Sequence, residues 1–96
     1  MPKQLLTQQT PAEIAQALAG RLRQRRKERK LTQAQLSSKS GVSLGSLRRL
    51  ESTGEVSLKS LIKLAIALDT ETDFDQLFAR RQYQSIQEII DEQERK

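Results

Sequence analysis

Residues 31–50, LTQAQLSSKSGVSLGSLRRL, decide the fold because they predict two short helices separated by a tight turn. Thr32 followed three residues later by Gln35 is typical of a capping box, in which two side chains satisfy the free amides of a helix start. Gly41 stands where the residue after a helix needs a positive φ, and Ser43 can cap the next helix. The stretch therefore predicts a helix, a turn and a second helix.

The apolar residues of this stretch give the two helices a defined crossing. Val42 follows the turn glycine and is expected to pack against the core, while Leu36, Leu47 and Leu50 lie on the inner faces. In a helix-turn-helix, the second helix enters the DNA major groove by its N-terminal end. The groove admits one helix, so the side chains at the front of that helix should be small, polar or basic.

Helix caps recur along the rest of the chain, and no stretch alternates as a strand does. Thr10, with Pro11 and Glu13 after it, predicts a helix that extends to about residue 29. Ser57 predicts another helix, apolar around most of its circumference and therefore central. The inward residues of the first helix are expected to be Ile14, Leu18 and Leu22. The exposed face of the central helix is expected to hold Lys59, Ser60, Lys63 and Ala67.

The C-terminal part of the chain carries two further helix starts. Thr72 with Asp75 predicts a short fifth helix, and Ser85 with Glu88 forms one more capping box pattern. The whole chain is expected to be all-α, with five helices and a short C-terminal extension. We expect a flexible N-terminus over 1–9, a helix-turn-helix domain over 10–70 and an extension over 71–96 that serves dimerisation or partner binding.

Composition excludes much chemistry. The 96 residues contain neither Cys nor His, so no disulfide, thiol nucleophile, imidazole base or Cys-based zinc site can form. No cluster of carboxylates with a nucleophile is visible, so we expect no enzyme, no metal and no cofactor. No stretch approaches the roughly 18 apolar residues of a membrane span, and the first residues lack the apolar run of a signal peptide. A soluble, cytoplasmic protein is the expectation.

Charge is distributed unevenly along the chain. Residues 1–60 hold 12 Lys and Arg against four Glu, a net charge of +8, whereas residues 61–96 hold five basic and eight acidic residues, a net charge of −3. A basic front half suggests a surface for a polyanion, and the back half suggests a different kind of surface. Charge alone leaves open whether the polyanion is a nucleic acid, because many small solvated domains are basic.

Residues 22–69 resemble the phage-repressor-like (XRE/Cro) helix-turn-helix family, and the spacing of the matching residues is specific to it. The variant LRRLESTGEVSLKSLIKLAIAL over 47–68 is further similar to HipB-like antitoxins, which are encoded beside HipA-like kinases. That second resemblance depends on the form of the linker between the predicted helices, over residues 51–57, and not on a functional motif. The residues that carry the family resemblance are Leu22, Arg23, Arg26, Leu31, Thr32, Gln33, Leu36, Gly41, Val42, Ser43, Leu47, Leu50, Glu51, Gly54 and Leu58 to Leu68.

The resemblance implies a set of DNA contacts. The family glutamine that braces on phosphate, and can reach a base, falls on Gln33. The base-reading positions fall on Ser43, Leu44, Gly45, Ser46 and Arg49, with Arg48 beside them. Leu44 and Gly45 depart from the hydrogen-bonding residues of many relatives, so specificity would depend more on the polar positions and on DNA shape. For each of these residues a purely solvated or capping role stays open.

Two other groups of residues have different expected roles. The resemblance implies that Arg26 and Glu51 form a structural ion pair, which fixes orientation and does not touch DNA. Lys39, at the end of the second helix, is a candidate phosphate neighbour. The surplus of apolar residues near the C-terminus either closes the monomer core or forms a symmetric dimer contact, which we favour. The candidate dimer residues are Phe74, Phe78, Ile86, Ile89 and Ile90.

The expected function is a sequence-specific transcriptional regulator that binds double-stranded operator DNA as a homodimer. The second resemblance implies an autoregulating antitoxin with a HipA-like kinase toxin as partner. Two rivals stay open: a protein-interaction module that chiefly binds such a toxin, and a stand-alone phage-type repressor.

Overall fold

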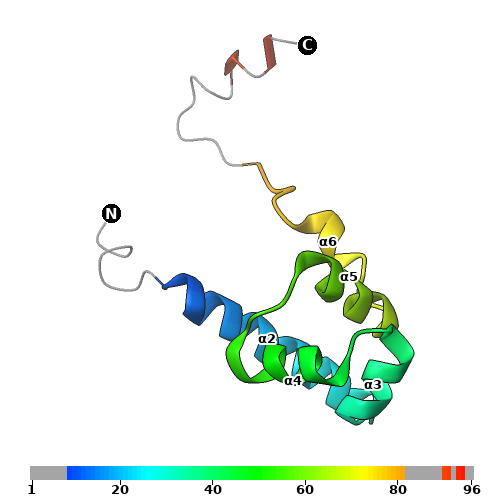
Figure 1. Ribbon diagram of the computed structural model, residues 1–96. Helices are drawn as coiled ribbons and strands as arrows, with labels where there is room; N and C mark the ends of the chain where they lie inside the picture. The colour runs from blue at the N-terminus through cyan, green and yellow to red at the C-terminus, as the bar shows by residue number, and fades with distance from the viewer. Residues whose placement is uncertain (1–8, 82–89, 92, 95–96) are drawn as a thin grey trace.

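The computed structural model describes residues 9–81, 90–91 and 93–94, and within these residues the chain is entirely helical, without strands. Figure 1 shows α4 lying beside α2, with α3 next to α4 and α6 following α5 on the other side. The all-α fold with five helices is confirmed. The helices are α2 (Pro11–Glu28), α3 (Gln33–Ser40), α4 (Leu44–Thr53), α5 (Leu58–Ala67) and α6 (Asp73–Gln76).

Side-chain caps fix the starts of the first four of these helices. Thr10 and Thr32 each form a complete capping box, with Glu13 and Gln35 as the returning acceptors. Ser43 and Ser57 each accept a hydrogen bond from the amide three residues later. Each cap satisfies amides that have no partner inside the helix, so helix starts are encoded locally.

Two glycines end the helices of the central motif. Gly41 after α3 and Gly54 after α4 have φ values of 79° and 82°, in the left-handed region that residues with a Cβ rarely adopt. The space around Gly41 is open, whereas a Cβ on Gly54 would lie 2.8 Å from the carbonyl carbon of Ala15 in α2. Gly54 therefore permits a sharp turn and also a close approach of two backbones.

The core lies where α2, α3, α4 and α5 meet. α4 packs on α2 and α3, and α3 packs on α5. Val42 is buried directly after the turn, and Leu64 and Leu68 bring the C-terminal half of α5 into the same core. The largest fully buried side chains are Leu36, Leu47, Leu50, Leu64 and Leu68.

The inner face of α2 differs from the predicted one. Leu22 is buried as predicted, but Ile14 and Leu18 are 52% and 38% exposed, and the other buried residues of α2 are Ala19 and Arg26. Gly54, at the end of α4, lies against the backbone of Ala15, so α4 meets α2 on the face that includes Ala15 and Ala19, and Ile14 and Leu18 lie beside that face. The small residues Ala15 and Gly54 allow this close contact, and the larger Ile14 and Leu18 are left exposed.

The exposed face of α5 was also predicted wrongly in part. Ala67 is buried at 7% exposure, whereas Leu58 and Ile66 are 64% and 54% exposed. α5 contacts its neighbours mainly through its C-terminal half, next to Leu64 and Leu68. Leu58, in the first turn, therefore projects past the core.

The segment after α5 is less regular than predicted. Thr72 has helical backbone angles and makes no side-chain cap, because 3₁₀-type bonds from residues 73 and 74 back to 70 and 71 already precede α6. α6 is only four residues long. Leu77 and Phe78 follow it, and Phe78 is 93% exposed with a φ of 61°. The capping box predicted at Ser85 and Glu88 lies outside the described residues.

Candidate nucleic-acid interface

Serine hydroxyls hold the turn between α3 and α4. Ser37 Oγ donates to the carbonyl of Val42 at 2.6 Å, and Ser40 Oγ accepts from the Val42 amide at 3.1 Å. Val42 itself is buried, so both of its backbone polar groups need partners. The turn thus fixes the direction in which α4 leaves α3.

The first turn of α4 presents two linked hydroxyls. Ser43 Oγ accepts from the Ser46 amide at 3.1 Å and donates to Ser46 Oγ at 2.9 Å. With its proton used in this bond, Ser43 is committed to the cap, and Ser46 keeps a hydroxyl proton to donate outward. Leu44 is half-buried, while Gly45 is exposed with open space where a Cβ would be.

The two arginines of α4 are both exposed, in contrast to the leucines on either side of them. Arg49 is not solitary: its Nε donates to Glu55 Oε1 at 2.8 Å, and its Nη2 pairs with the same oxygen. Glu55 lies in the loop between α4 and α5 and was absent from the predicted site. Its position six residues beyond Arg49, past a turn, gives no periodic signal in the sequence.

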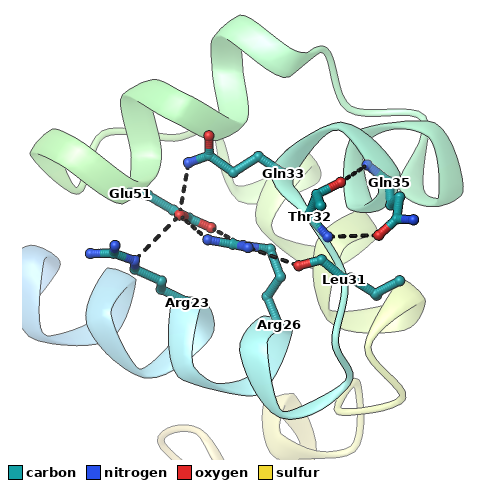
Figure 2. A network of polar contacts seen from close by, with 7 residues as sticks. All are labelled: Arg23, Arg26, Leu31, Thr32, Gln33, Gln35 and Glu51. Carbon is teal, nitrogen blue, oxygen red and sulfur yellow. Dashed lines mark hydrogen bonds and ion pairs between the residues drawn. The ribbon is translucent and has the colours of Figure 1, made fainter.

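A buried carboxylate joins α2, α3 and α4 behind this surface (Figure 2). Arg26 donates to Glu51 through Nε at 2.8 Å and through Nη2 at 2.9 Å, and its Nη1 donates to the carbonyl of Leu31 at 2.8 Å. Arg23 adds a longer ion pair to Glu51 at 3.9 Å. The predicted pair of Arg26 and Glu51 is thus present, and the Glu51 side chain is only 4% exposed.

Gln33 belongs to the same network, which the sequence did not indicate. Its Nε2 donates to Glu51 Oε1 at 2.9 Å (Figure 2). This bond fixes the orientation of the amide and directs one of its hydrogens inward, leaving the amide oxygen and one hydrogen for another partner. Gln33 at the start of α3 is therefore oriented by the end of α4.

The pKa of Glu51 reflects this environment. Burial by itself raises the pKa of the Glu51 carboxyl, because the charged form loses solvent. Hydrogen bonds from Arg26 and Gln33, and the positive charges of Arg26 and Arg23, outweigh burial and place the pKa below its ordinary value. The carboxylate is thus ionised at neutral pH and can keep all of its donors.

The remaining predicted residues lie elsewhere. Lys39 lines a shallow hollow between α3 and α5, together with Lys63 and Ile66, and is not part of the front of α4. Among the candidate dimer residues, Phe74 is half-buried, while Phe78 and Ile90 are exposed. Ile86 and Ile89 lie outside the described residues.

The described residues contain neither a metal-binding cluster nor a membrane-spanning helix. No group of His, Cys, Asp or Glu within them could hold a metal ion. None of their helices is long and apolar enough to cross a membrane.

The geometry defines a helix-turn-helix DNA-binding domain: a supporting helix, a glycine turn and a second helix with buried leucines behind an exposed polar front. A family model described as helix-turn-helix matches residues 22–74, which is more than half of the 96 residues. No curated protein matches the chain significantly. The chain belongs to the phage-repressor-like (XRE/Cro) helix-turn-helix family, a DNA-binding regulatory family and not an enzyme family. It is a DNA-binding transcriptional regulator.

Proposed function

We propose that this regulator binds a specific operator as a homodimer, with the front of α4 in the major groove, and that it autoregulates an operon in which it serves as antitoxin of a HipA-like kinase. The observation that carries the operator proposal is the division of α4 into two faces. Leu47 and Leu50 are buried, whereas Gly45, Ser46 and Arg49 face outward. A helix so divided can enter a groove without disturbing its own core.

Within this proposal the residues at the front of α4 have different tasks. Ser46 offers a hydroxyl donor, and Arg49 offers a guanidinium of the kind that reads guanine. Gly45 lets the helix backbone approach the bases closely, and Leu44 can contact a thymine methyl group. Gln33, oriented by Glu51, braces on phosphate at the start of α3.

Affinity in this proposal comes mainly from the basic half of the chain. The net charge of +8 over residues 1–60 supplies many Lys and Arg for phosphates, whereas base contacts supply the specificity. Arg23, Lys39 and Arg48 are exposed and belong to this group.

Two arguments support the homodimer and the partner. One domain of this kind reads few base pairs, so two copies on two half-sites are needed for a specific operator. Phe78 and Leu77, exposed after α6, give a surface that a second copy can cover. The antitoxin role is supported by the resemblance of residues 47–68 to HipB-like proteins, and a stand-alone repressor is its alternative.

A fluorescence anisotropy titration tests the operator proposal. The chain's own upstream DNA is compared with a scrambled duplex at about 50 and about 200 mM salt, where a protein with 6–10 phosphate contacts loses roughly 10³–10⁵ in affinity. We expect tight binding to the upstream DNA, weak binding to the scrambled duplex and a steep salt dependence for both.

Variants then separate base contacts from phosphate contacts. Arg49→Ala should weaken operator binding by about 1–3 kcal/mol and relax the preference at one base pair. Arg21→Ala, which removes an exposed positive charge from α2, is the matched control and should leave base preference unchanged. Equal, weak binding of the unaltered protein to both duplexes would contradict the operator proposal. Co-purification with the product of the neighbouring gene tests the antitoxin role.

A further inference from the structure

The ion pair between Arg49 and Glu55 joins the recognition helix to the loop that follows it. Both N–H groups on one edge of the guanidinium, Nε and Nη2, are directed at the single oxygen Oε1 of Glu55. The two side chains are 68% and 61% exposed, and pairs so open to solvent contribute little to stability. The stability of the fold therefore does not explain the pair.

The loop holds Glu55 at a fixed place relative to Arg49. Thr53 Oγ1 donates to the carbonyl of Arg49 at 2.7 Å and accepts from the Glu55 amide at 3.2 Å, so one hydroxyl links the two residues. Between them, Gly54 turns the chain with its positive φ and lies directly on the backbone of Ala15 in α2. Packing and hydrogen bonds thus fix the backbone from which the carboxylate extends.

The edge of Arg49 that Glu55 occupies determines which edge remains. A guanidinium has five N–H donors in a rigid plane, and the side edge made by Nε and Nη2 is taken. The end of the plane, formed by Nη1 and the outer hydrogen of Nη2, stays available as a two-pronged donor. Guanine presents two acceptors, O6 and N7, in the major groove, whereas adenine presents one acceptor and one donor there.

The negative charge of Glu55 has a second effect. A carboxylate beside Arg49 repels the phosphates toward which a free arginine would swing, and it restricts the rotamers of a long side chain before DNA arrives. Contacts between Arg49 and the phosphates, which every DNA sequence offers, become weaker. The contact between Arg49 and one base costs less side-chain entropy, because the side chain is already ordered.

We propose that Glu55 is a specificity-determining positioning residue, which holds the guanidinium of Arg49 by its side edge so that the end edge reads a guanine. The proposal rests on the proposed function, in which Arg49 faces the bases. Thr53 and Gly54 contribute to this positioning, because they fix the backbone of Glu55 relative to that of Arg49.

The test uses the full chain and duplexes in which each base pair of the operator is changed in turn. Arg49→Ala first identifies the base pair that Arg49 reads. Glu55→Gln should then lower discrimination at that pair by about tenfold, within the range of a lost bidentate contact. Because Glu55→Gln removes a negative charge, it should also bind scrambled DNA a few-fold more tightly, by roughly the effect of one phosphate contact.

Three further variants separate geometry from charge. Glu55→Asp keeps the charge but shortens the reach, so it should lose discrimination without tightening on scrambled DNA. Glu71→Gln, at an exposed position in the turn before α6, makes the same change of charge outside the recognition helix and should leave discrimination intact. The double variant Arg49→Ala/Glu55→Gln should discriminate no worse than Arg49→Ala alone. Unchanged thermal unfolding verifies that each variant is folded.

The outcomes distinguish the two proposals. If Arg49→Ala loses discrimination and Glu55→Gln keeps it, the role of Glu55 is overturned and the proposed function stands. If Arg49→Ala changes no base preference, both the base contact of Arg49 and the role of Glu55 are wrong. If Glu55→Gln and Glu71→Gln weaken discrimination equally, the effect is one of general charge and Glu55 positions nothing.

Discussion

At the scale of single residues, Glu51 connects the structural and the recognition parts of the molecule. Its carboxylate accepts from Arg26 in α2 and from Gln33 in α3, although it belongs to α4 itself. Breaking a buried pair leaves the other charge without compensation, which is costly even where the pair as a whole adds little stability. Glu51 therefore fixes how three helices meet, and it orients the one glutamine expected at a phosphate.

Glu51→Gln should reveal this dependence. Because Arg26 would stay buried without a full negative charge, we expect the free energy of unfolding at pH 7 to fall by about 3 kcal/mol, measured by urea denaturation. Glu28→Gln is the matched control, since Glu28 is paired with Arg25 on the surface, where such a change costs about 0–1 kcal/mol. Equal effects of the two substitutions would contradict a special role for Glu51.

The lowered pKa of Glu51 gives this stabilisation a pH dependence. A carboxyl whose pKa is lower in the folded than in the unfolded chain stabilises the fold above the unfolded-state value of about 4.3. That contribution is lost as the pH falls through the still lower folded-state pKa. The unaltered protein and Glu51→Gln should therefore differ most at neutral pH and converge below about pH 4. A difference that stays constant down to acid pH would contradict this account.

At the scale of elements, the two turn glycines have different requirements although their φ values are nearly equal. Gly41 needs only the left-handed conformation, whereas Gly54 needs that conformation and the absence of a Cβ against α2. A turn can thus require glycine because of its local backbone conformation or because of tertiary packing.

Alanine substitution should separate these two reasons. Gly41→Ala should lower stability by about 1–2 kcal/mol, the cost of a left-handed L-residue. Gly54→Ala should cost about 1–3 kcal/mol more, because its Cβ would meet the backbone of Ala15 at 2.8 Å. Thermal unfolding of both variants measures the difference. A smaller effect at Gly54 than at Gly41 would mean that α2 can move away at little cost.

The same contrast explains how much could be predicted from the sequence. The starts of α2 to α5 depend on caps that span only four residues, and all four were predicted. The inner face of α2 was predicted correctly only at Leu22, because the contact between α2 and Gly54 at the end of α4 depends on tertiary packing and not on the hydrophobicity of Ile14 and Leu18. Within the candidate site, the network at Glu51 was predicted only as the pair with Arg26. The bonds from Gln33 to Glu51 and from Arg49 to Glu55 depend on how the chain folds, and no spacing in the sequence predicts them.

At the scale of the whole molecule, charge is distributed unevenly along the chain. The basic half contains the helix-turn-helix, and exposed apolar residues follow α6. Arg29 at the end of α2 pairs with Asp69 after α5 at 2.7 Å, so the first and the last large helix are joined at their C-terminal ends. This ion pair thus connects the first and the last of the four helices from α2 to α5.

The proposed dimer can be tested at Phe78. Because Phe78 is 93% exposed, Phe78→Ser should change the stability of the monomer by no more than about 0.5 kcal/mol. It should nevertheless shift sedimentation equilibrium toward monomer and weaken operator binding. Leu58→Ser, a change at another exposed apolar residue, on α5, should leave the association intact. If Leu58→Ser dissociates the protein and Phe78→Ser does not, the interface lies on α5 and not after α6.

The separation of faces on α4 has a consequence for how such regulators diverge. Leu47 and Leu50 keep the helix in the core, while Gly45, Ser46, Arg48 and Arg49 are exposed. If the front of α4 reads the operator as proposed, mutations at those outward positions can change which operator is recognised at little cost to folding. After a gene duplication, two copies could acquire separate operators in a few steps, each intermediate still folded. The same freedom makes α4 a suitable helix for redirecting the protein to a chosen DNA sequence.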